Sequence, residues 1–342
     1  MLNHLESLCR LCGASGQETP VRNYLIAQIE SLGLPYQVDP LGNLIVEKKG
    51  NQTPPKKWMI GAHMDEVGCI ITYLNSNGTM QIAPVGGIDP SVVIGRSVQV
   101  GEDLLPGVIG AKPVHLLSSE ERKKAPSFSQ LYLDIGAKDK AEAETLVQPG
   151  TYVHFCSDYT LLGGGKRIRS KALDDRIGCA ILLHLLEQEV PYDFTAAFHV
   201  QEEIGLRGAK VAAYTIAPDF ALILETTTAA DFPSASADGK VCQLGNGPVV
   251  SFMDRSTLYD RELYRLANTL CQENGIPIQT KTRIAGGNDS GAVHVSRGGV
   301  RTLAISAPCR NLHSPSCVAN LTDIQHCLTL TLLLLKQAGT LL

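Results

Sequence analysis

Short apolar segments that alternate with helical patterns constrain the fold of this chain more than any other feature. The sequence reads FTAAFHV at 194–200, FALILET at 220–226 and VRTLAIS at 300–306, and each run is typical of a buried strand. Helical patterns occupy 173–189, before the first of these runs, and 260–275, between the second and the third. Strands separated by helices predict a mixed, mostly parallel sheet that is covered by helices on both faces.

The segment from 68 to 162 has a different pattern. Short β-like runs such as GCIITYL, RSVQVG and TYVHFCSD alternate there with glycine and proline. This spacing predicts a small antiparallel β-barrel or sandwich inserted into the α/β fold, of which we favour the barrel. We therefore expect residues 1–67 and 163–342 to form one α/β domain and residues 68–162 to form a second, β-rich one. Before the insertion, Ser15 and Glu18 fit a capping box, which predicts that Ser15 caps a helix ending near Gly33.

Composition and charge exclude several classes of protein. The 342 residues carry a net charge of −4, so no basic surface for nucleic acid is expected. The N-terminal residues MLNHLESLCRLC lack the layout of a signal peptide, and the apolar run at 328–335 is too short to span a bilayer. We expect a buried terminal helix, no membrane partner and a cytoplasmic protein whose ten cysteines are reduced.

Polar residues that follow the predicted strands are the candidates for chemistry, because sites of α/β sheets gather at the carboxyl ends of strands. One further carboxylate stands where the helix at 173–189 begins. The candidates are His63, Asp65, Asp174, Glu202, Glu203, Glu225 and His313.

Imidazole and carboxylate ligands without cysteine suit zinc, manganese or cobalt. Five ligands with one bridging carboxylate would hold two ions about 3.5–4 Å apart, as in two-metal hydrolases. The adjacent Glu202 and Glu203 then have an explanation. One of them can bind metal while the other acts as general base, and the metal charge offsets their repulsion. In HMDE, Asp65 can orient the imidazole of His63.

Each candidate also has an ordinary structural interpretation. His63 and His313 could be hydrogen-bonded loop histidines, the two glutamates could lie in a solvated loop, and Asp174 could be a helix N-cap. The prediction of a site therefore depends on the convergence of these positions. The other seven histidines lack this context and are interpreted as structural.

Five motifs together resemble the tetrahedral aminopeptidases, a family of two-metal metallopeptidases that includes FrvX-like glutamyl aminopeptidases. These motifs are AHMDEVG, ALDDRIG, QEEIGLRGA, GGNDSGA and RNLHSP, and the resemblance extends from about residue 5 to 335. It implies a phosphorylase/hydrolase-like α/β fold with an inserted dimerisation domain. It also implies a metallo-aminopeptidase that removes the N-terminal residue of short peptides and assembles from dimers into a dodecamer.

The resemblance also implies a role for each residue. One ion would take His63, Asp174 and Glu225, and the second would take Asp174, Glu203 and His313. Glu202 would be the general base and Asp65 would orient the first histidine. The family commonly has aspartate where this chain has Glu225, and Ser316 and Cys317 stand where an acidic residue usually follows HSP.

Three alternatives remain open at this point. A two-metal deacylase or carboxypeptidase would carry the same residues, and comparison of aminoacyl with N-acyl substrates discriminates it. A non-catalytic assembly or binding protein would be expected to have lost a ligand or the base. A cysteine-nucleophile enzyme would need a cysteine beside a histidine, and Cys317 near His313 comes closest.

Overall fold

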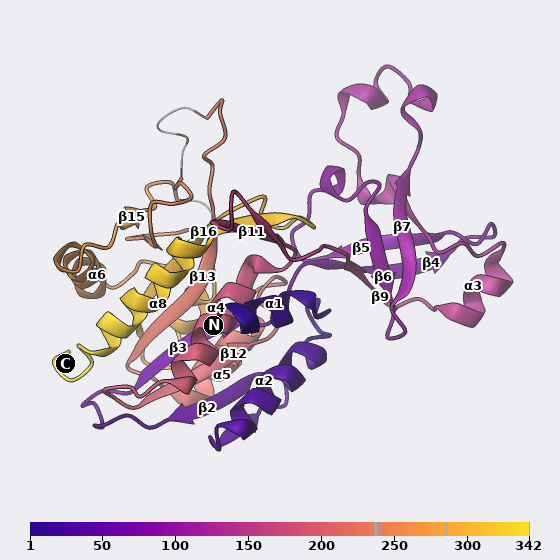
Figure 1. Cartoon of the computed structure of the whole chain (residues 1–342). Coiled ribbons are helices and arrows are strands. Elements are labelled where there is room, and N and C mark those ends of the chain that lie inside the picture. The colour runs from indigo at the N-terminus through magenta and orange to yellow at the C-terminus, as the bar shows by residue number, and fades with distance from the viewer. Residues whose placement is uncertain (236–238, 240, 285, 342) are drawn as a thin grey trace.

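The apolar segments become the parallel centre of an eleven-stranded mixed sheet (Figure 1). The structure, a computed structural model, describes residues 1–235, 239, 241–284 and 286–341. The four central strands lie side by side and parallel. They are β12 (Phe194–His199), β3 (Trp58–His63), β13 (Phe220–Thr228) and β16 (Arg301–Arg310).

Antiparallel strands extend both sides of this centre. Beyond β12 lie β2 (Leu44–Lys48) and β1 (Tyr36–Val38). Beyond β16 lie β17 (Cys317–Asn320), β11 (Arg167–Ser170) and β10 (Thr160–Leu162). Two short strands, β14 (Val249–Val250) and β15 (Gln279–Thr280), branch from β16.

Helices cover both faces of the sheet, as a parallel centre that is buried on both sides requires. The larger core contains apolar residues of α1 (Leu2–Arg10), α2 (Thr19–Ser31), α4 (Leu173–Glu187), α6 (Arg261–Glu273) and α8 (Leu321–Leu335). The opposite face packs against α5 (Arg207–Ile216) and α7 (Ser290–Val293). The apolar run at 328–335 thus lies in a packed terminal helix, and none of the described helices combines the length and hydrophobicity needed to cross a bilayer.

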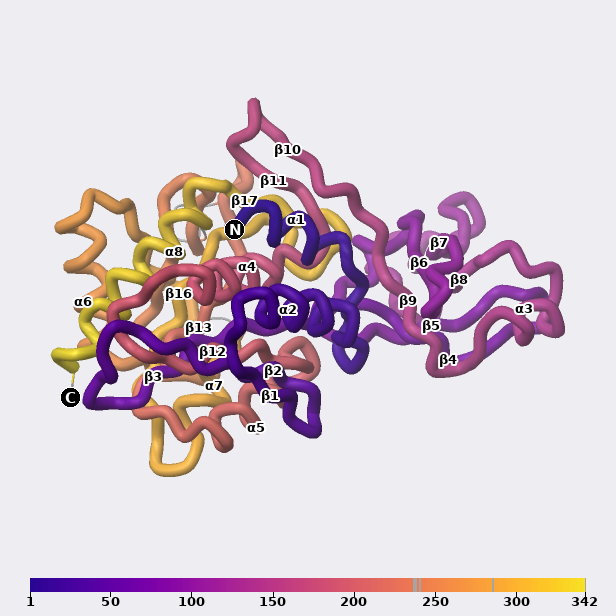
Figure 2. Tube along the Cα trace, turned by 60° about the horizontal axis from the view of Figure 1, so that its bottom comes forward, coloured from indigo at the N-terminus to yellow at the C-terminus, as the bar shows by residue number. Residues whose placement is uncertain are grey.

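Residues between β3 and β10 form a closed six-stranded barrel with its own apolar core (Figure 2). Its strands follow the order β4 (Gly68–Leu74), β5 (Met80–Val85), β8 (Leu131–Asp134), β7 (Leu105–Ala111), β6 (Ser97–Val100) and β9 (Tyr152–Phe155). Helix α3 (Lys140–Leu146) packs beside it. Both views place the barrel at one side of the sheet and its helices. The predicted fold class, an α/β sheet with an inserted β-barrel, is confirmed.

Candidate metal centre and active site

Three neighbouring parallel strands bring their carboxyl ends to one edge of the sheet. His63 is the last residue of β3, Glu225 lies in β13, and Glu202 and Glu203 lie on the loop after β12, which ends at His199. Two further candidates arrive from other elements. Asp174 lies at the start of α4, and His313 lies on the loop between β16 and β17.

One group of possible ligands forms around His63. Its Nε2 atom lies 3.3 Å from Oδ1 of Asp174 and 3.7 Å from Oε2 of Glu225. All three side chains are largely buried, and their candidate ligand atoms lie within 4.8 Å of one another. Glutamate at position 225, one methylene longer than aspartate, therefore reaches the histidine.

A second group forms around His313. Its Nε2 atom lies 3.5 Å from Oδ2 of Asp174 and 3.4 Å from Oε2 of Glu203. Asp174 thus offers one carboxylate oxygen to each group. Its backbone has φ −86° and ψ 109°, which is not helical although it lies in the first turn of α4. The five predicted ligands are therefore brought together as two triplets that share one aspartate.

Asp65 holds the loop that carries the two glutamates. Its buried carboxylate accepts hydrogen bonds from the backbone N–H groups of Glu202 at 2.9 Å and Glu203 at 3.1 Å. The Nδ1 atom of His63 lies 3.1 Å from the Asp65 carbonyl oxygen and 3.4 Å from its carboxylate. One aspartate thereby positions both the first histidine and the glutamate pair.

The predicted helix cap at Ser15 is wrong. Helix α2 begins at Thr19 after Glu18, and no side-chain cap bond is made there. The Ser15 hydroxyl is buried and donates instead to Asp65 at 2.6 Å, a tertiary bond that competes with the local capping pattern. Ser15 belongs to the support of the site.

Carboxylates crowd this edge of the sheet, and burial raises the pKa of Glu202 and of Glu225 well above the usual range for glutamate. Burial, with the charge of Asp174, raises the pKa of Glu203 to about 8. A hydrogen bond to Asp174 raises the pKa of His313 to about 10. Without metal, these glutamate and histidine side chains therefore keep their protons at pH values at which the same side chains on an ordinary surface would have lost them.

His63 and Asp174 shift toward their charged forms. Burial opposes the charged form of His63, but Glu225, Asp174 and Asp65 together raise its pKa well above the usual value. Burial likewise opposes ionisation of Asp174, but His313 and His63 hold its pKa below the usual value. Two histidines face this excess of carboxylates, so the residues fit divalent cations that would supply the missing positive charge.

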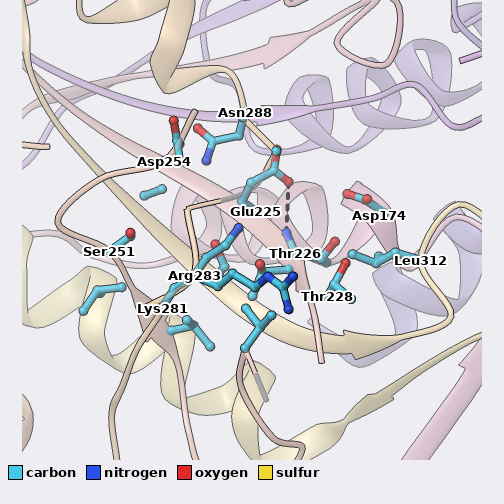
Figure 3. A pocket seen from close by; sticks show the side chains of 18 of the residues that line it. Asp174, Glu225, Thr226, Thr228, Ser251, Asp254, Lys281, Arg283, Asn288 and Leu312 are labelled. Carbon is cyan, nitrogen blue, oxygen red and sulfur yellow. Dashed lines mark hydrogen bonds between the residues drawn. The ribbon is translucent and has the colours of Figure 1, made fainter. Parts of the chain in front are cut away.

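A cavity of about 380 Å³ opens beside the two triplets. It is lined by Glu202 and by residues of β13, and Lys281 and Arg283 contribute cationic groups (Figure 3). Asp254 also lines it, but its carboxylate accepts hydrogen bonds from Ser256, Thr257 and Tyr259 of its own turn. A side chain bound here would therefore meet the charges of Lys281 and Arg283.

Two features of this region could not be recognised in the sequence. Lys281 and Arg283 lie on an irregular segment without periodicity, so nothing marked them as cavity residues. The second feature is the pairing of His199, whose Nδ1 atom lies 2.7 Å from Oδ2 of the buried Asp289. The motif GGNDSGA contains Asp289, but the sequence does not indicate that this residue contacts a histidine.

Comparison with known proteins agrees with this metal-dependent hydrolase geometry. The sequence profile of the M42 glutamyl aminopeptidase family matches residues 42–330. A putative aminopeptidase of Acetivibrio thermocellus is 36% identical over 96% of this chain and 97% of its own. The glutamyl aminopeptidase of Lactococcus lactis subsp. cremoris is 32% identical over 94% of this chain and 92% of its own.

Among solved structures, the TET1 peptidase of Pyrococcus horikoshii superposes with a TM-score of 0.86 at 34% identity. The match covers 99% of each chain, and that peptidase can assemble into a tetrahedron or a large octahedral shell. The present chain belongs to the M42 glutamyl aminopeptidase family. It is a metal-dependent aminopeptidase, and the resemblance seen in its motifs is confirmed.

Proposed function

We propose that this enzyme removes the N-terminal residue of short peptides with two divalent ions bound at the edge of the sheet. The ions would be zinc, cobalt or manganese, held by His63, Asp174 and Glu225 and by Asp174, Glu203 and His313. The observation that carries this proposal is the geometry of Asp174, whose two oxygens face different histidines at 3.3 and 3.5 Å. A carboxylate in this position is suited to bridge two cations.

When bound, such ions lower the pKa of water and polarise a carbonyl group. Glu202 lies beside both triplets without belonging to either, and it also lines the cavity. It is placed to accept the proton of the attacking water and to deliver that proton to the leaving amine. The carboxylates around it attract a protonated α-amine, which favours cleavage at the N-terminus of a peptide.

The cavity supports a preference for an acidic N-terminal residue. Lys281 and Arg283 line it, and Thr228 and Ser251 add hydroxyl groups (Figure 3). Guanidinium and ammonium groups bind carboxylates by charge-assisted hydrogen bonds. We therefore expect glutamyl and aspartyl peptides to be cleaved faster than lysyl peptides.

The barrel supports a role in assembly. It lies beside the sheet that carries the site, and Val114 and Leu116 on its long loop are 71% and 59% exposed. We propose that the β-rich segment 68–162 makes the dimer contact and that dimers build a dodecamer in the cytoplasm. Light scattering should then give a mass well above that of one chain, whereas a stable monomer would contradict this part of the proposal.

Cleavage of a panel of aminoacyl anilides tests the activity and the preference together. We expect release of the aniline from the free aminoacyl substrates, with the highest kcat/KM for glutamyl or aspartyl. N-acylated versions should be inert. Chelation should abolish the activity, and added zinc, cobalt or manganese should restore it. Arg283→Glu should lower kcat/KM for the glutamyl substrate and spare the alanyl one.

Three results would contradict parts of this proposal. Full activity after removal of metal would contradict the two-ion mechanism. Cleavage of N-acyl substrates alone would identify a deacylase, and a preference for lysyl anilide would contradict the assignment of the cavity.

A further inference from the structure

His199 and Asp289 form a buried pair that the reaction described above does not use. The exposed fractions of the two residues are 0% and 1%, and His199 Nδ1 lies 2.7 Å from Asp289 Oδ2. Within the described part of the chain, His199 Nε2 and Asp289 Oδ1 have no hydrogen-bond partner. Burying a polar pair whose remaining atoms are unsatisfied is costly, so the arrangement calls for an explanation.

His199 belongs to the edge that carries the metal ligands. It is the last residue of β12 and lies opposite His63 in the parallel register of β12 and β3. Its carbonyl oxygen accepts a 2.7 Å hydrogen bond from the N–H of Met64, the residue after His63. The ring lies over Gly61, because a Cβ atom at that position would come within 2.6 Å of His199 Cε1.

Asp289 is buried directly behind the wall of the cavity. It follows Gly286, Gly287 and Asn288, which line the cavity, and α7 begins directly after it. This wall is bonded on its other side to the neighbouring turn, through Gly286 and Arg255 at 2.9 Å. The amide of Asn288 likewise donates to the hydroxyl of Tyr259 at 2.9 Å.

We propose that the His199–Asp289 pair is a positioning element that holds the wall of the substrate cavity in register with the metal-binding edge. The bond joins the strand end beside His63 to the segment whose residues 286–288 line the cavity. A shift of about 1 Å between a bound side chain and the reacting centre can cost up to about 100-fold in rate. Loss of the bond should therefore affect most strongly those substrates whose side chains fill the cavity.

This inference rests on the proposed function, because it concerns how the cavity serves the same reaction. A buried pair that only stabilised the fold would act differently. Its loss would lower the stability of the protein and the cleavage of every substrate by the same factor. The ratio of kcat/KM between two substrates therefore distinguishes a positioning role from a purely stabilising one.

The test compares kcat/KM for two anilides in each variant. One is the aminoacyl anilide with a long side chain that the wild type cleaves best, and the other is alanyl anilide, which leaves the cavity largely empty. The variants are His199→Ala, Asp289→Ala and the double variant. Asp289→Asn keeps a carbonyl oxygen that can accept from the imidazole N–H.

A matched control exists in the barrel. His154 is also a buried histidine, and its Nε2 atom lies 3.0 Å from Oε1 of Gln17. His154→Ala removes a buried imidazole that does not line the cavity. Metal content and thermal unfolding are measured for every variant in the full chain at neutral pH.

We expect each alanine variant of the pair to lower the ratio of kcat/KM between the two substrates by about tenfold, with metal content unchanged. The double variant should lose no more than either single one, because the two residues act through one bond. Asp289→Asn should recover most of the ratio, and His154→Ala should keep the wild-type ratio.

An unchanged ratio in the alanine variants would overturn the inference. Equal losses for both substrates, or losses that multiply in the double variant, would do so as well. If the alanine variants do not fold, His199→Asn decides by the same ratio, which it should lower while Asp289→Asn keeps it. Failure of both asparagine variants to fold would show a purely structural pair. An inactive wild type would instead contradict the proposed function itself.

Discussion

Two buried charge clusters lie close together in the sequence but differ in composition. Glu66 and Lys171 belong to the first cluster. His63, three residues before Glu66, and Asp174, three residues after Lys171, belong to the second. In the first cluster, Glu66 Oε1 accepts hydrogen bonds from Lys171 at 2.7 Å and Arg176 at 3.4 Å. The N–H of Gly13 donates to the same oxygen at 3.1 Å. All three charged side chains are buried, and the cations outnumber the carboxylate.

The second cluster, at the edge of the sheet, has the opposite composition. Asp174, Glu203 and Glu225 face two histidines, with no lysine or arginine among the described residues of either triplet. Charges that are buried without partners are costly. The carboxylate of Glu66 is therefore paired by cations of the protein itself, and this cluster ties the N-terminal segment to α4. The cluster around Asp174 requires cations from outside the chain.

The largest effect should come from the shared ligand. Asp174→Asn removes the carboxylate that faces both histidines, so both ions should be lost together. We expect activity to fall by more than about 10⁴-fold, because the metal chemistry is lost with them. Metal analysis by mass spectrometry beside kinetics checks this. Retention of two ions with near-normal turnover would show that Asp174 is no bridge.

The two adjacent glutamates should separate by kinetics and metal content. Glu202→Gln keeps the shape but cannot accept a proton, so kcat should fall by roughly 10²–10⁴ while both ions remain. Glu203→Gln should weaken one ion site, because a neutral amide is a poor ligand. Its activity should recover partly at high metal concentration. The reverse pattern of metal loss would exchange the two roles.

The protein-only cluster should respond in stability. Lys171→Met removes one partner of Glu66 and leaves the buried carboxylate with Arg176 and the N–H of Gly13. We expect a loss of about 1.5–3 kcal/mol in the free energy of unfolding, measured with denaturant, because one charged hydrogen bond is lost while Arg176 still compensates the carboxylate. Added metal should not restore this loss, whereas it should restore stability lost on chelation. An unchanged free energy of unfolding would show that the Glu66 cluster does not stabilise the fold.

The smallest effect should be a difference in pH dependence. In the metal-free protein, the pKa of Glu203 is raised from 4.5 to about 8 and that of His313 from 6.5 to about 10. The folded state then binds more protons than the unfolded state, so stability should fall as pH rises between about 5 and 10. Added metal should reduce this dependence of stability on pH.

His154 in the barrel should act in the opposite direction. Burial lowers its pKa from 6.5 to about 4, so the unfolded state binds more protons between these values. Stability should fall as pH drops through this window, and His154→Gln should reduce the fall by up to about 3 kcal/mol. Denaturant unfolding from pH 4 to 9 measures both effects. A gain in stability of the metal-free protein from pH 6 to 9 would contradict the charge balance described here.

Much of the site could be predicted because its geometry follows from the strands. His63 ends β3, Glu203 comes shortly after β12, and Glu225 lies in the second half of β13, so the order of the parallel strands places all three near one edge. The barrel could likewise be predicted from its short alternating runs. Asp174 and His313 were weaker candidates, because Asp174 begins a helix and His313 follows its strand only after a loop; the motifs supported both.

What could not be predicted depends on contacts between distant segments. The pattern around Ser15 fits a helix cap, and only the folded chain brings Asp65 to its hydroxyl at 2.6 Å. The pairing of His199 with Asp289 joins residues 90 positions apart in sequence. Lys281 and Arg283 face the cavity because of an irregular segment, whose course no local pattern determines.

Anomalous diffraction from crystals grown with zinc would show whether two ions share Asp174. We expect two peaks per chain, roughly 3.5–4 Å apart, one near His63 and Glu225 and the other near His313 and Glu203. Both peaks should lie within bonding distance of Asp174. A single peak, or two peaks of which one does not touch Asp174, would contradict the sharing of Asp174.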